Sequence, residues 1–288
     1  MSTLRNPHSQ FDAKLQAAFE QNILAALLED VGTGDLTGML VPTEARVSAR
    51  VIVREAAVLC GAPWFEGVML AIDQETEIAW QYAEGEMMAA DSVVCTIAAS
   101  PRSLLTAERA ALNFMQLLSG VASATRSYVD VVAGTNAAIL DTRKTLPGLR
   151  QAQKYAVRVG GGQNQRMALY DGILIKENHI AAAGGVTRAL ANAAALDAGV
   201  TVQIEVETIA QLEEALAAGV TSVLLDNFDL DMMRAAVQVN AGRALLEASG
   251  GINMATVRAI AETGVDRISI GSLRKDIRAT DYSLRIVG

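Results

Sequence analysis

The carboxyl-terminal half of the chain repeats one pattern six times. A short apolar, β-branched run ends in polar or charged residues, and a helical stretch follows it. The polar ends lie about 20 to 35 residues apart, a workable length for a βα unit. This alternation predicts a parallel sheet that binds ligands at the carboxyl ends of its strands. The runs are Ala137–Lys144, Gly172–Asn178, Val202–Glu207, Ser222–Asn227, Ala244–Gly251 and Arg267–Gly271.

Six strands are fewer than the eight of a closed TIM barrel, so we expect an α/β fold built as an open, incomplete α/β barrel related to the TIM barrel. We place this barrel at residues 113–275. Residues 1–112 differ, with an amphipathic helix over 11–28 and possible antiparallel strands at 47–53, 78–82 and 93–98. These residues indicate a separate α+β domain, followed by a long helix that includes residues 104–118.

Composition narrows the class of protein. The 288 residues are 51% hydrophobic but only 4% aromatic, which predicts a large aliphatic core. No apolar run approaches the roughly 18 residues of a membrane span, and residues 1–11 carry no apolar signal core, so we expect a cytoplasmic protein. Cys60 and Cys95 are too few for a disulfide framework or a four-thiolate metal site. A pI near 4.9 argues against nucleic acid as a partner.

One segment opposes the charge of the rest of the chain. Residues 141–179 hold seven cationic side chains against three carboxylates, whereas the whole chain has a net charge of −8. Such a segment suggests a pocket for a small polyanion. The ordinary alternative is a solvated basic helix face. We favour the pocket because Arg143, Lys144 and Lys176 directly follow apolar runs and therefore lie at strand ends.

Two carboxylates belong to the same edge of the predicted barrel. Glu205 and Asp226 end successive strands, so they converge over the mouth that receives the cations. Carboxylates facing a cationic wall suit Mg²⁺ on a diphosphate, a developing carbocation, or both. The alternative is that one or both are structural ion-pair partners of the basic segment.

Glycine marks two further strand ends. Ser249, Gly250 and Gly251 close one strand, and Gly271 with Ser272 closes the next. Two such ends in succession predict a phosphate site, although each alone reads as an ordinary tight turn. The triplet Gly160–Gly162 lacks the spacing of a dinucleotide fingerprint. We expect it to turn Asn164, Gln165 and Arg166 toward the site.

Seven of these motifs, taken in order, closely resemble the quinolinate phosphoribosyltransferase family. They read DTRKTLPGLR, GGGQNQR, LIKENHI, IEVET, LLDNF, EASGGI and ISIG, and EDVGTGDLT and TAERAALNFMQLLSG in the amino-terminal part are similar to the same family. The resemblance implies an amino-terminal α/β sandwich and an open barrel, with residues 276–288 packing back on the sandwich. It also implies a homodimer whose active sites are each completed by the neighbouring subunit. The implied reaction is Mg²⁺-dependent: quinolinate and phosphoribosyl pyrophosphate give nicotinate mononucleotide, diphosphate and CO₂, a step of de novo NAD biosynthesis.

The resemblance also implies roles for individual residues. Arg143, Arg166 and Lys176 would hold the two quinolinate carboxylates, since a guanidinium pairs with a carboxylate bidentately. We expect the other cations of the segment, Arg150, Lys154 and Arg158, on a helix surface. The remaining assignments are Thr142 as a hydrogen-bonding partner of quinolinate, Lys144 at the phosphoribosyl donor, Glu205 and Asp226 at the ribose and its Mg²⁺, directly or through water, Ser249–Gly251 and Ile270–Ser272 at the 5′-phosphate, and Arg109 entering the neighbouring subunit's site.

One residue departs from the family pattern. Members usually carry histidine where this chain has Gln165, so an uncharged amide replaces a titratable ring at the substrate site. Two other enzyme classes stay open: a related phosphoribosyltransferase with another acceptor, of the molybdenum-transport-associated type, and a barrel aldolase using Lys144 or Lys176 as a Schiff-base amine. A non-catalytic binding protein fits poorly with acids and bases on six strand ends.

Overall fold

The structure, a computed structural model, describes residues 11–41 and 45–287. Residues 1–10, in which the sequence shows no apolar leader, lie outside this range. The chain divides into two compact units, each described here by itself. The first contains Met1–Arg126, Thr145–Gly161 and Asp276–Gly288, and the second contains Ser127–Lys144 and Gly162–Lys275.

This division differs from the expected boundary at residue 112. Helix α3 (Pro101–Val131) continues without a break, so residues 113–126 stay with the first unit. Residues 145–161 join that unit because α4 (Arg150–Val159) buries Ala152, Ala156 and Val157 in its core. A single domain boundary near residue 112 cannot account for α4, which comes later in the chain but packs in the first unit.

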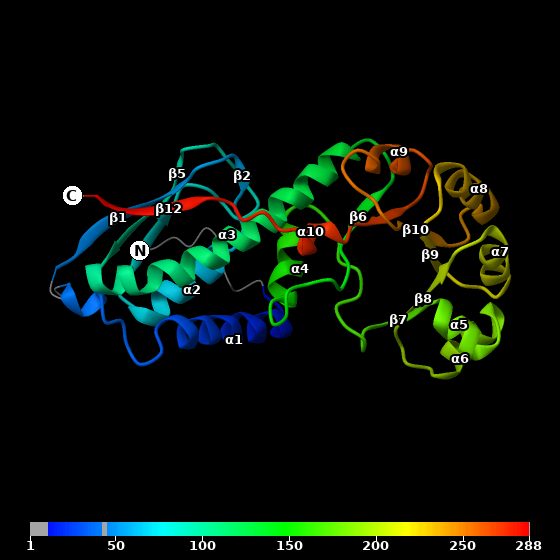
Figure 1. Ribbon diagram of the computed structural model, residues 1–288, viewed down its shortest axis with the longest axis horizontal. Helices are drawn as coiled ribbons and strands as arrows, with labels where there is room; N and C mark the ends of the chain where they lie inside the picture. Colours follow the sequence, from blue (N-terminus) through cyan, green and yellow to red (C-terminus); the bar gives the residue numbers. More distant parts are fainter. Residues whose placement is uncertain (1–10, 42–44, 288) are drawn as a thin grey trace. The chain divides into compact units, whose positions relative to one another are not determined.

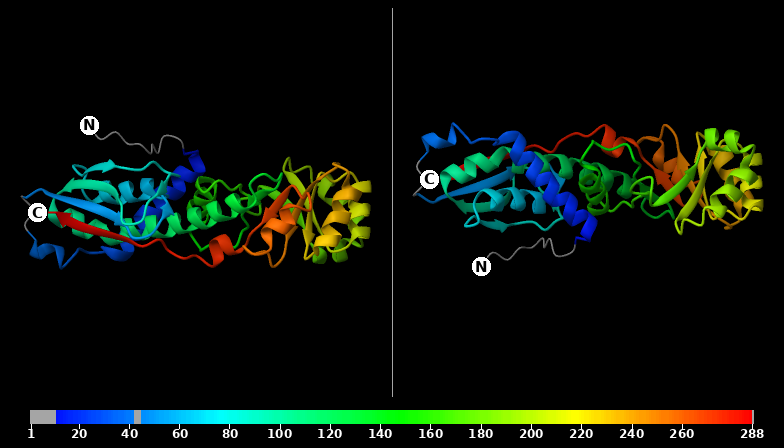
Figure 2. Two further views of the ribbon diagram at one scale, coloured as in Figure 1. Left: turned by 90° about the horizontal axis from the view of Figure 1, so that it is seen from above. Right: turned by 90° about the horizontal axis from the view of Figure 1, so that it is seen from below.

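The first unit contains a four-stranded antiparallel sheet in the order β12-β1-β5-β3. The last strand of the chain pairs with the first, from Ser48 with Val287 to Val53 with Tyr282, and Arg278 bonds to Glu55, so residues 278–287 pack on the amino-terminal unit (Figure 2). The alternation in β1 is the pattern of a strand with one solvated face. The strands are β1 (Val47–Val53), β3 (Glu77–Trp80), β5 (Val93–Ala99) and β12 (Tyr282–Val287), with a small pair β2 (Ala57–Val58) and β4 (Met87–Met88).

Helices α1 (Ala13–Asp30), η2 (Gly38–Leu40), α2 (Ala62–Ile72), α3 and α4 complete the first unit. The core is not purely aliphatic, contrary to the expectation from composition. Phe19, Trp64 and Tyr155 form a cluster with Phe11, with ring centroids 5.4 to 5.7 Å apart. The chain has few aromatic residues, but this unit concentrates them at one place.

Helix α2 begins at a buried carboxylate. Glu84 accepts hydrogen bonds from the backbone N–H groups of Gly61 (2.7 Å) and Ala62 (3.1 Å), which are otherwise unpaired at a helix start. Burial raises the pKa of Glu84 to about 7, even though these N–H groups and Tyr155 stabilise the charged form. The Glu84 carboxyl group therefore titrates near neutral pH.

The second unit confirms the expected open barrel. Its six strands are all parallel, in the order β6-β11-β10-β9-β8-β7, and helices α5 to α8 lie along one side of the sheet (Figure 1). The strands are β6 (Ala138–Leu140), β7 (Gly172–Ile175), β8 (Thr201–Val206), β9 (Ser222–Asp226), β10 (Leu245–Ser249) and β11 (Arg267–Ser269). The helices are α5 (Glu177–Ala183), α6 (Val186–Ala195), α7 (Ile209–Ala217), α8 (Leu230–Asn240), α9 (Val257–Ala261) and α10 (Ser272–Lys275).

Local signals explain where these helices begin and end. The Thr208 hydroxyl accepts from the backbone N–H of Gln211 at 3.2 Å, and Gly219 follows α7 with φ +82°. Asn253 does not cap α9 directly, because its side chain accepts from Ala255 N–H in a turn and the helix starts at Val257. No helix in the described ranges combines the length and apolar character that a membrane crossing requires.

Candidate active site

The carboxyl ends of the six parallel strands bring the predicted site residues to one edge of the sheet. Glu205 lies one residue before the end of β8, Asp226 ends β9 and Ser249 ends β10. Thr142, Arg143 and Lys144 follow β6, and Lys176 follows β7. The edge is therefore bipolar, with carboxylates on the central strands and cations on the two outermost strands of the sheet.

Arg143 and Arg166 form the strongest cationic feature. Burial, and after it the positive charge of Arg143, lowers the pKa of Arg166, while Asp171 acts in the opposite direction. Arg166 also donates to the carbonyl of Gly172 at 2.9 Å, which ties it to the start of β7. Two guanidinium groups whose charges influence each other in this way are suited to a ligand with more than one negative charge.

Lys176 and Glu205 form an ion pair across neighbouring strands. Lys176 Nζ lies 2.8 Å from Glu205 Oε2, and the side chain of Glu205 is 9% exposed whereas that of Lys176 is 45% exposed. Glu205 is therefore the buried partner and Lys176 the accessible one. The structure realises the ion-pair alternative for Glu205, but an ammonium group has three donors, so Lys176 retains hydrogen-bonding capacity toward a ligand.

The two glycine-containing strand ends have different geometries. Gly250 has φ +102°, and a Cβ at this position would lie 3.0 Å from the backbone N of Asn227, so only glycine fits. Gly271 instead supports Lys144, because a Cβ built there would lie 3.6 Å from Lys144 Nζ. Lys144 N–H donates to the Thr142 hydroxyl at 3.1 Å. The cation expected at the phosphoribosyl donor thus lies against one of the predicted phosphate loops.

Asp226 is the more accessible of the two strand-end carboxylates. Its Oδ2 accepts from Asn227 Nδ2 at 2.9 Å, and its side chain is partly exposed. Among the residues that the structure describes, no group of three or more His, Cys, Asp or Glu side chains could by itself hold a metal ion. The donor set is thus compatible with a hard cation bound by one or two carboxylates, water and a ligand, as is usual for Mg²⁺.

Gln165 points into the barrel and begins a line of hydrogen bonds. Its Nε2 donates to Gln203 Oε1 at 2.7 Å, and Gln203 Nε2 donates to Glu247 Oε2 at 2.9 Å. Burial raises the pKa of Glu247, which is 1% exposed. A cavity of about 700 Å³, lined in part by Gln203, Glu247 and Arg267, continues toward the amino ends of the strands. Sequence reasoning missed Gln203, although it lies two residues before Glu205 and so faces the same side of the strand.

The structure places the other predicted cations individually. Arg109 is exposed on α3 in the first unit. Arg158 is exposed on α4, as expected, but Lys154 is fully buried, so its assignment to a helix surface was wrong. The apolar side of α4 packs into the core of its unit and takes Lys154 with it.

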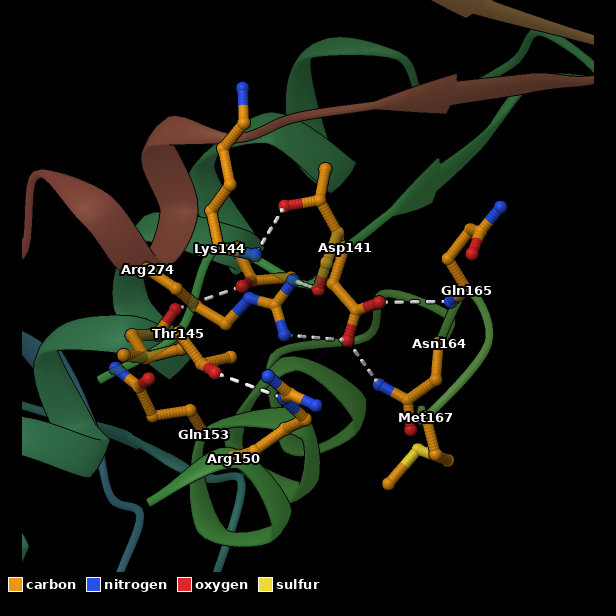
Figure 3. A network of polar contacts seen from close by, with 12 residues as sticks. Asp141, Lys144, Thr145, Arg150, Gln153, Asn164, Gln165, Met167 and Arg274 are labelled. Atoms are coloured by element: carbon orange, nitrogen blue, oxygen red, sulfur yellow. Dashed lines mark hydrogen bonds and ion pairs between the residues drawn. The ribbon is translucent and has the colours of Figure 1, made fainter. Parts of the chain in front are cut away.

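Asp141 and Arg274 are the site residues that the sequence signalled least. Both are fully buried and form an ion pair with Arg274 Nη1 at 3.2 Å from Asp141 Oδ2 (Figure 3). The sequence pattern marks Asp141 only as one of the three carboxylates in the basic segment 141–179 and predicts no role for Arg274. The available signal was the position of Asp141 directly before Thr142.

Two family models match most of the chain. Residues 34–119 match the model of the quinolinate phosphoribosyl transferase amino-terminal domain, and residues 121–285 match that of its carboxyl-terminal domain. The chain is 39% identical to the nicotinate-nucleotide pyrophosphorylase [carboxylating] of Mycobacterium leprae, over 95% of this chain and 98% of that protein. A probable enzyme of the same name from Bacillus subtilis is 38% identical, over 90% of each chain.

A solved structure supports the same relationship. The nicotinate-nucleotide pyrophosphorylase from Francisella tularensis superposes with a TM-score of 0.92 and 41% identity, covering 94% of this chain and 96% of that one. Both domain models together match most of the chain in the expected order. From its sequence motifs, its open barrel and these matches, the chain belongs to the quinolinate phosphoribosyltransferase family.

Proposed function

We propose that this protein transfers the phosphoribosyl group of phosphoribosyl pyrophosphate to quinolinate and decarboxylates the product to nicotinate mononucleotide. The observation that carries the proposal is the arrangement of Arg143 and Lys176 at the carboxyl edge of the sheet in a member of this family, with Arg166 tied to the start of β7 and its pKa lowered in part by the charge of Arg143. Quinolinate carries two adjacent carboxylates. A dianion of this shape relieves the repulsion between the two guanidinium groups when it binds.

The acceptor side of the site uses three cations. Arg143 and Arg166 each pair with a substrate carboxylate, and the accessible ammonium of Lys176 adds a further donor while it remains bonded to Glu205. The Thr142 hydroxyl lies next to Arg143 and supplies a hydrogen bond. Gln165 contributes only an amide, so acceptor binding depends chiefly on the arginines.

The donor side uses the opposite part of the edge. Lys144, held against Gly271, contacts the phosphoribosyl donor, and the backbone N–H groups of Ser249–Gly251 and Ile270–Ser272 bind its 5′-phosphate. Glu205 and Asp226 face the ribose. We assign Mg²⁺ to the same side, where the carboxylates of Asp226 and Glu205 would hold it. When bound, the ion supplies neutralisation of the leaving diphosphate.

The chemistry then follows from charge development. The bond from ribose C1 to the diphosphate oxygen breaks, positive charge grows on C1, and the pyridine nitrogen of quinolinate attacks it. Glu205 and Asp226 stabilise this positive charge electrostatically, so no covalent enzyme intermediate is required. The quaternary ring nitrogen then stabilises the electron pair left when the neighbouring carboxylate departs as CO₂. The ring carbon takes up a proton from solvent.

The assembly is part of the same proposal. Arg109 is exposed on α3, and following the family resemblance we assign it to the active site of a second copy in a homodimer. The cytoplasmic location follows the sequence expectation and agrees with two buried free cysteines, Cys60 and Cys95. Size measurement in solution, together with complementation between an Arg109→Ala chain and a chain inactive at Glu205, tests the shared site.

Two competing classes are less well supported. A Schiff-base enzyme needs a neutral amine, whereas Lys176 is in an ion pair with Glu205. A phosphoribosyltransferase with another acceptor would have no need for paired guanidinium groups. The test is to incubate the protein with phosphoribosyl pyrophosphate, Mg²⁺ and either quinolinate or nicotinate, and to measure product and CO₂. Turnover of nicotinate without turnover of quinolinate would contradict the proposal.

A further inference from the structure

Asp141 is a fully buried carboxylate that receives donors from several segments. Its Oδ1 accepts from the backbone N–H of Gln165 at 2.8 Å, and its Oδ2 accepts from Asn164 Nδ2 at 2.7 Å. Arg274 Nη1 lies 3.2 Å from the same Oδ2. Figure 3 shows these donors converging on the carboxylate from different sides. Both carboxylate oxygens are therefore committed to protein donors, so Asp141 is not placed to contact substrate.

Each donor belongs to a segment that carries proposed binding groups. Asn164 and Gln165 precede Arg166, and Arg274 lies in α10 directly after the loop Ile270–Ser272. Asp141 itself precedes Thr142, Arg143 and Lys144. Arg274 Nη2 donates to the Thr142 carbonyl as well, so one guanidinium binds both the carboxylate and the backbone that follows it.

Backbone pairing alone joins these segments only loosely. Asp141 N–H donates to the Gln163 carbonyl at 3.1 Å and Gln163 N–H donates to the Ile139 carbonyl at 2.8 Å, but this contact is an isolated bridge and not a strand pair. On the other side, Ile270 N–H donates to the Leu140 carbonyl at 2.9 Å. Beyond these points, the side-chain contacts of Asp141 with Asn164 and Arg274, and of Arg274 with the Thr142 carbonyl, add to the links between the three segments.

The stability of the fold does not by itself explain why Asp141 and Arg274 form a buried ion pair. Well-packed apolar side chains of similar volume often stabilise a fold as much as or more than a buried pair does. Here the Asp141 carboxylate of the pair also accepts from Asn164 and Gln165, so it joins the segment of Arg143 to that of Arg166, whose pKa the charge of Arg143 lowers. A site that must present two guanidinium groups to one dianion needs a fixed negative charge behind them.

We propose that Asp141 is a positioning residue that, through Arg274 and the segment Asn164–Arg166, sets the spacing of Arg143 and Arg166 for the two carboxylates of the acceptor. This proposal rests on the proposed function for the identity of the acceptor. Asp141 acts without touching substrate. Two of its contacts come from Asn164 and Gln165, directly before Arg166, so its replacement changes acceptor affinity more than the affinity for phosphoribosyl pyrophosphate.

The first test is Asp141→Asn, which keeps the shape of the side chain but replaces one acceptor oxygen by a donor. We expect the quinolinate KM to rise at least tenfold, while the phosphoribosyl pyrophosphate KM changes less than threefold. Leu212→Ala is the matched control, because it weakens the buried core of the same unit and touches none of these polar groups. An unchanged quinolinate KM in Asp141→Asn, or an equal rise in Leu212→Ala at the same loss of Tm, would overturn the proposal.

A charge exchange separates positioning from general damage. Asn164→Asp alone sets two carboxylates side by side, and we expect it to raise the quinolinate KM as much as Asp141→Asn does. Asp141→Asn combined with Asn164→Asp restores an amide-to-carboxylate bond between the two positions and keeps one negative charge near Arg274. We expect the double variant to recover the quinolinate KM to within threefold of the parent, and failure to recover any affinity contradicts the direct link. If Asp141→Asn does not fold, Asn164→Ala, which removes one donor only, must raise the quinolinate KM threefold or more.

Amide hydrogen exchange distinguishes failure of this proposal from failure of the proposed function. The Gln165 N–H is bonded to Asp141 in the parent protein, so its exchange should accelerate at least tenfold in Asp141→Asn and stay unchanged in Leu212→Ala. This readout needs no substrate. If the parent protein does not turn over quinolinate, the proposed function is wrong, but the exchange data still test whether Asp141 holds residues 163–166. If exchange at residues 163–166 is unaltered in Asp141→Asn, the positioning role of Asp141 is wrong and the proposed function is unaffected.

Discussion

Replacing Glu205 with alanine tests whether this carboxylate acts on the reacting sugar or only balances Lys176. The Glu205 side chain is 9% exposed, so it faces the site in a water-poor environment, whereas Lys176 is 45% exposed. Removing a preorganised group that stabilises developing charge costs about 10²- to 10³-fold in kcat, or about 2.7–4 kcal/mol. Losing an ion pair with a half-exposed partner costs at most about 1 kcal/mol, because water replaces the lost contact. The two roles therefore differ by more than tenfold in the expected effect.

The assay is steady-state formation of nicotinate mononucleotide by Glu205→Ala at saturating phosphoribosyl pyrophosphate. We expect kcat to fall at least 100-fold and the quinolinate KM to stay within threefold of the parent value. Glu207→Ala is the control, since Glu207 lies two residues further along and is exposed. A fall of less than tenfold in kcat, accompanied by a raised quinolinate KM, would show that Glu205 serves only as the counter-ion of Lys176 and would refute the assigned role.

Three further predictions concern a titratable substitution, a buried carboxyl and a glycine. Gln165→His should have a lower quinolinate KM than the parent below about pH 6.5, where the ring gains charge, and the same KM as the parent at pH 8. If quinolinate KM depends on pH in the same way in both proteins, position 165 is peripheral to acceptor binding. Burial raises the pKa of Glu84 from its ordinary value of 4.5 to about 7, so its contribution to stability is complete below pH 4.5 and is lost as pH rises toward 7, by up to about 3 kcal/mol. Urea unfolding at pH 5 and pH 8 measures this loss. The free energy of unfolding of Glu84→Gln should change less between these two pH values, and an equal change in Glu84→Gln would assign the loss to another group. Gly250→Ala should raise the phosphoribosyl pyrophosphate KM at least tenfold, because the added Cβ would meet Asn227. Gly242 also has a positive φ but has open space around it, so Gly242→Ala should not raise this KM. An equal rise in KM in both variants would contradict the steric argument.

The strands of the barrel could be predicted from local pattern. A β-branched run such as the one ending at Asp226 is short, apolar and bounded by turn residues. Five of the six runs contain the strand observed, and the sixth, Val202–Glu207, starts one residue after β8 begins. In a parallel sheet the carboxyl ends of the strands share one edge, so the positions of Glu205, Asp226 and Lys176 along the sequence were enough to place them near one another. Their hydrogen-bond partners were not predictable in the same way.

The limits of prediction come from contacts between distant segments. Helix α4 is inserted into the amino-terminal unit from residues 150–159, and nothing in its own composition says which core its apolar face joins. Lys154 was assigned to a surface for the same reason. Arg274 follows Asp141 by more than 130 residues, so their ion pair depends on the neighbouring positions of β11 and β6 in the sheet. Strand order, which the sequence pattern leaves open, decides the second outcome, and the packing of α4 in the first unit decides the first.

The interior line from Gln165 to Glu247 offers a physical account of the residue that departs from the family pattern. A histidine at position 165 would bring a titratable ring next to Gln203 and close in sequence to Arg166, whose cationic form burial already disfavours. Glutamine donates to Gln203 without adding charge, and Gln203 donates onward to a carboxyl whose pKa burial raises. Because the line from Gln165 through Gln203 carries no positive charge, the guanidinium groups of Arg143 and Arg166 remain the main positive charges offered to an acceptor. This arrangement makes acceptor binding depend on their spacing, and hence on Asp141.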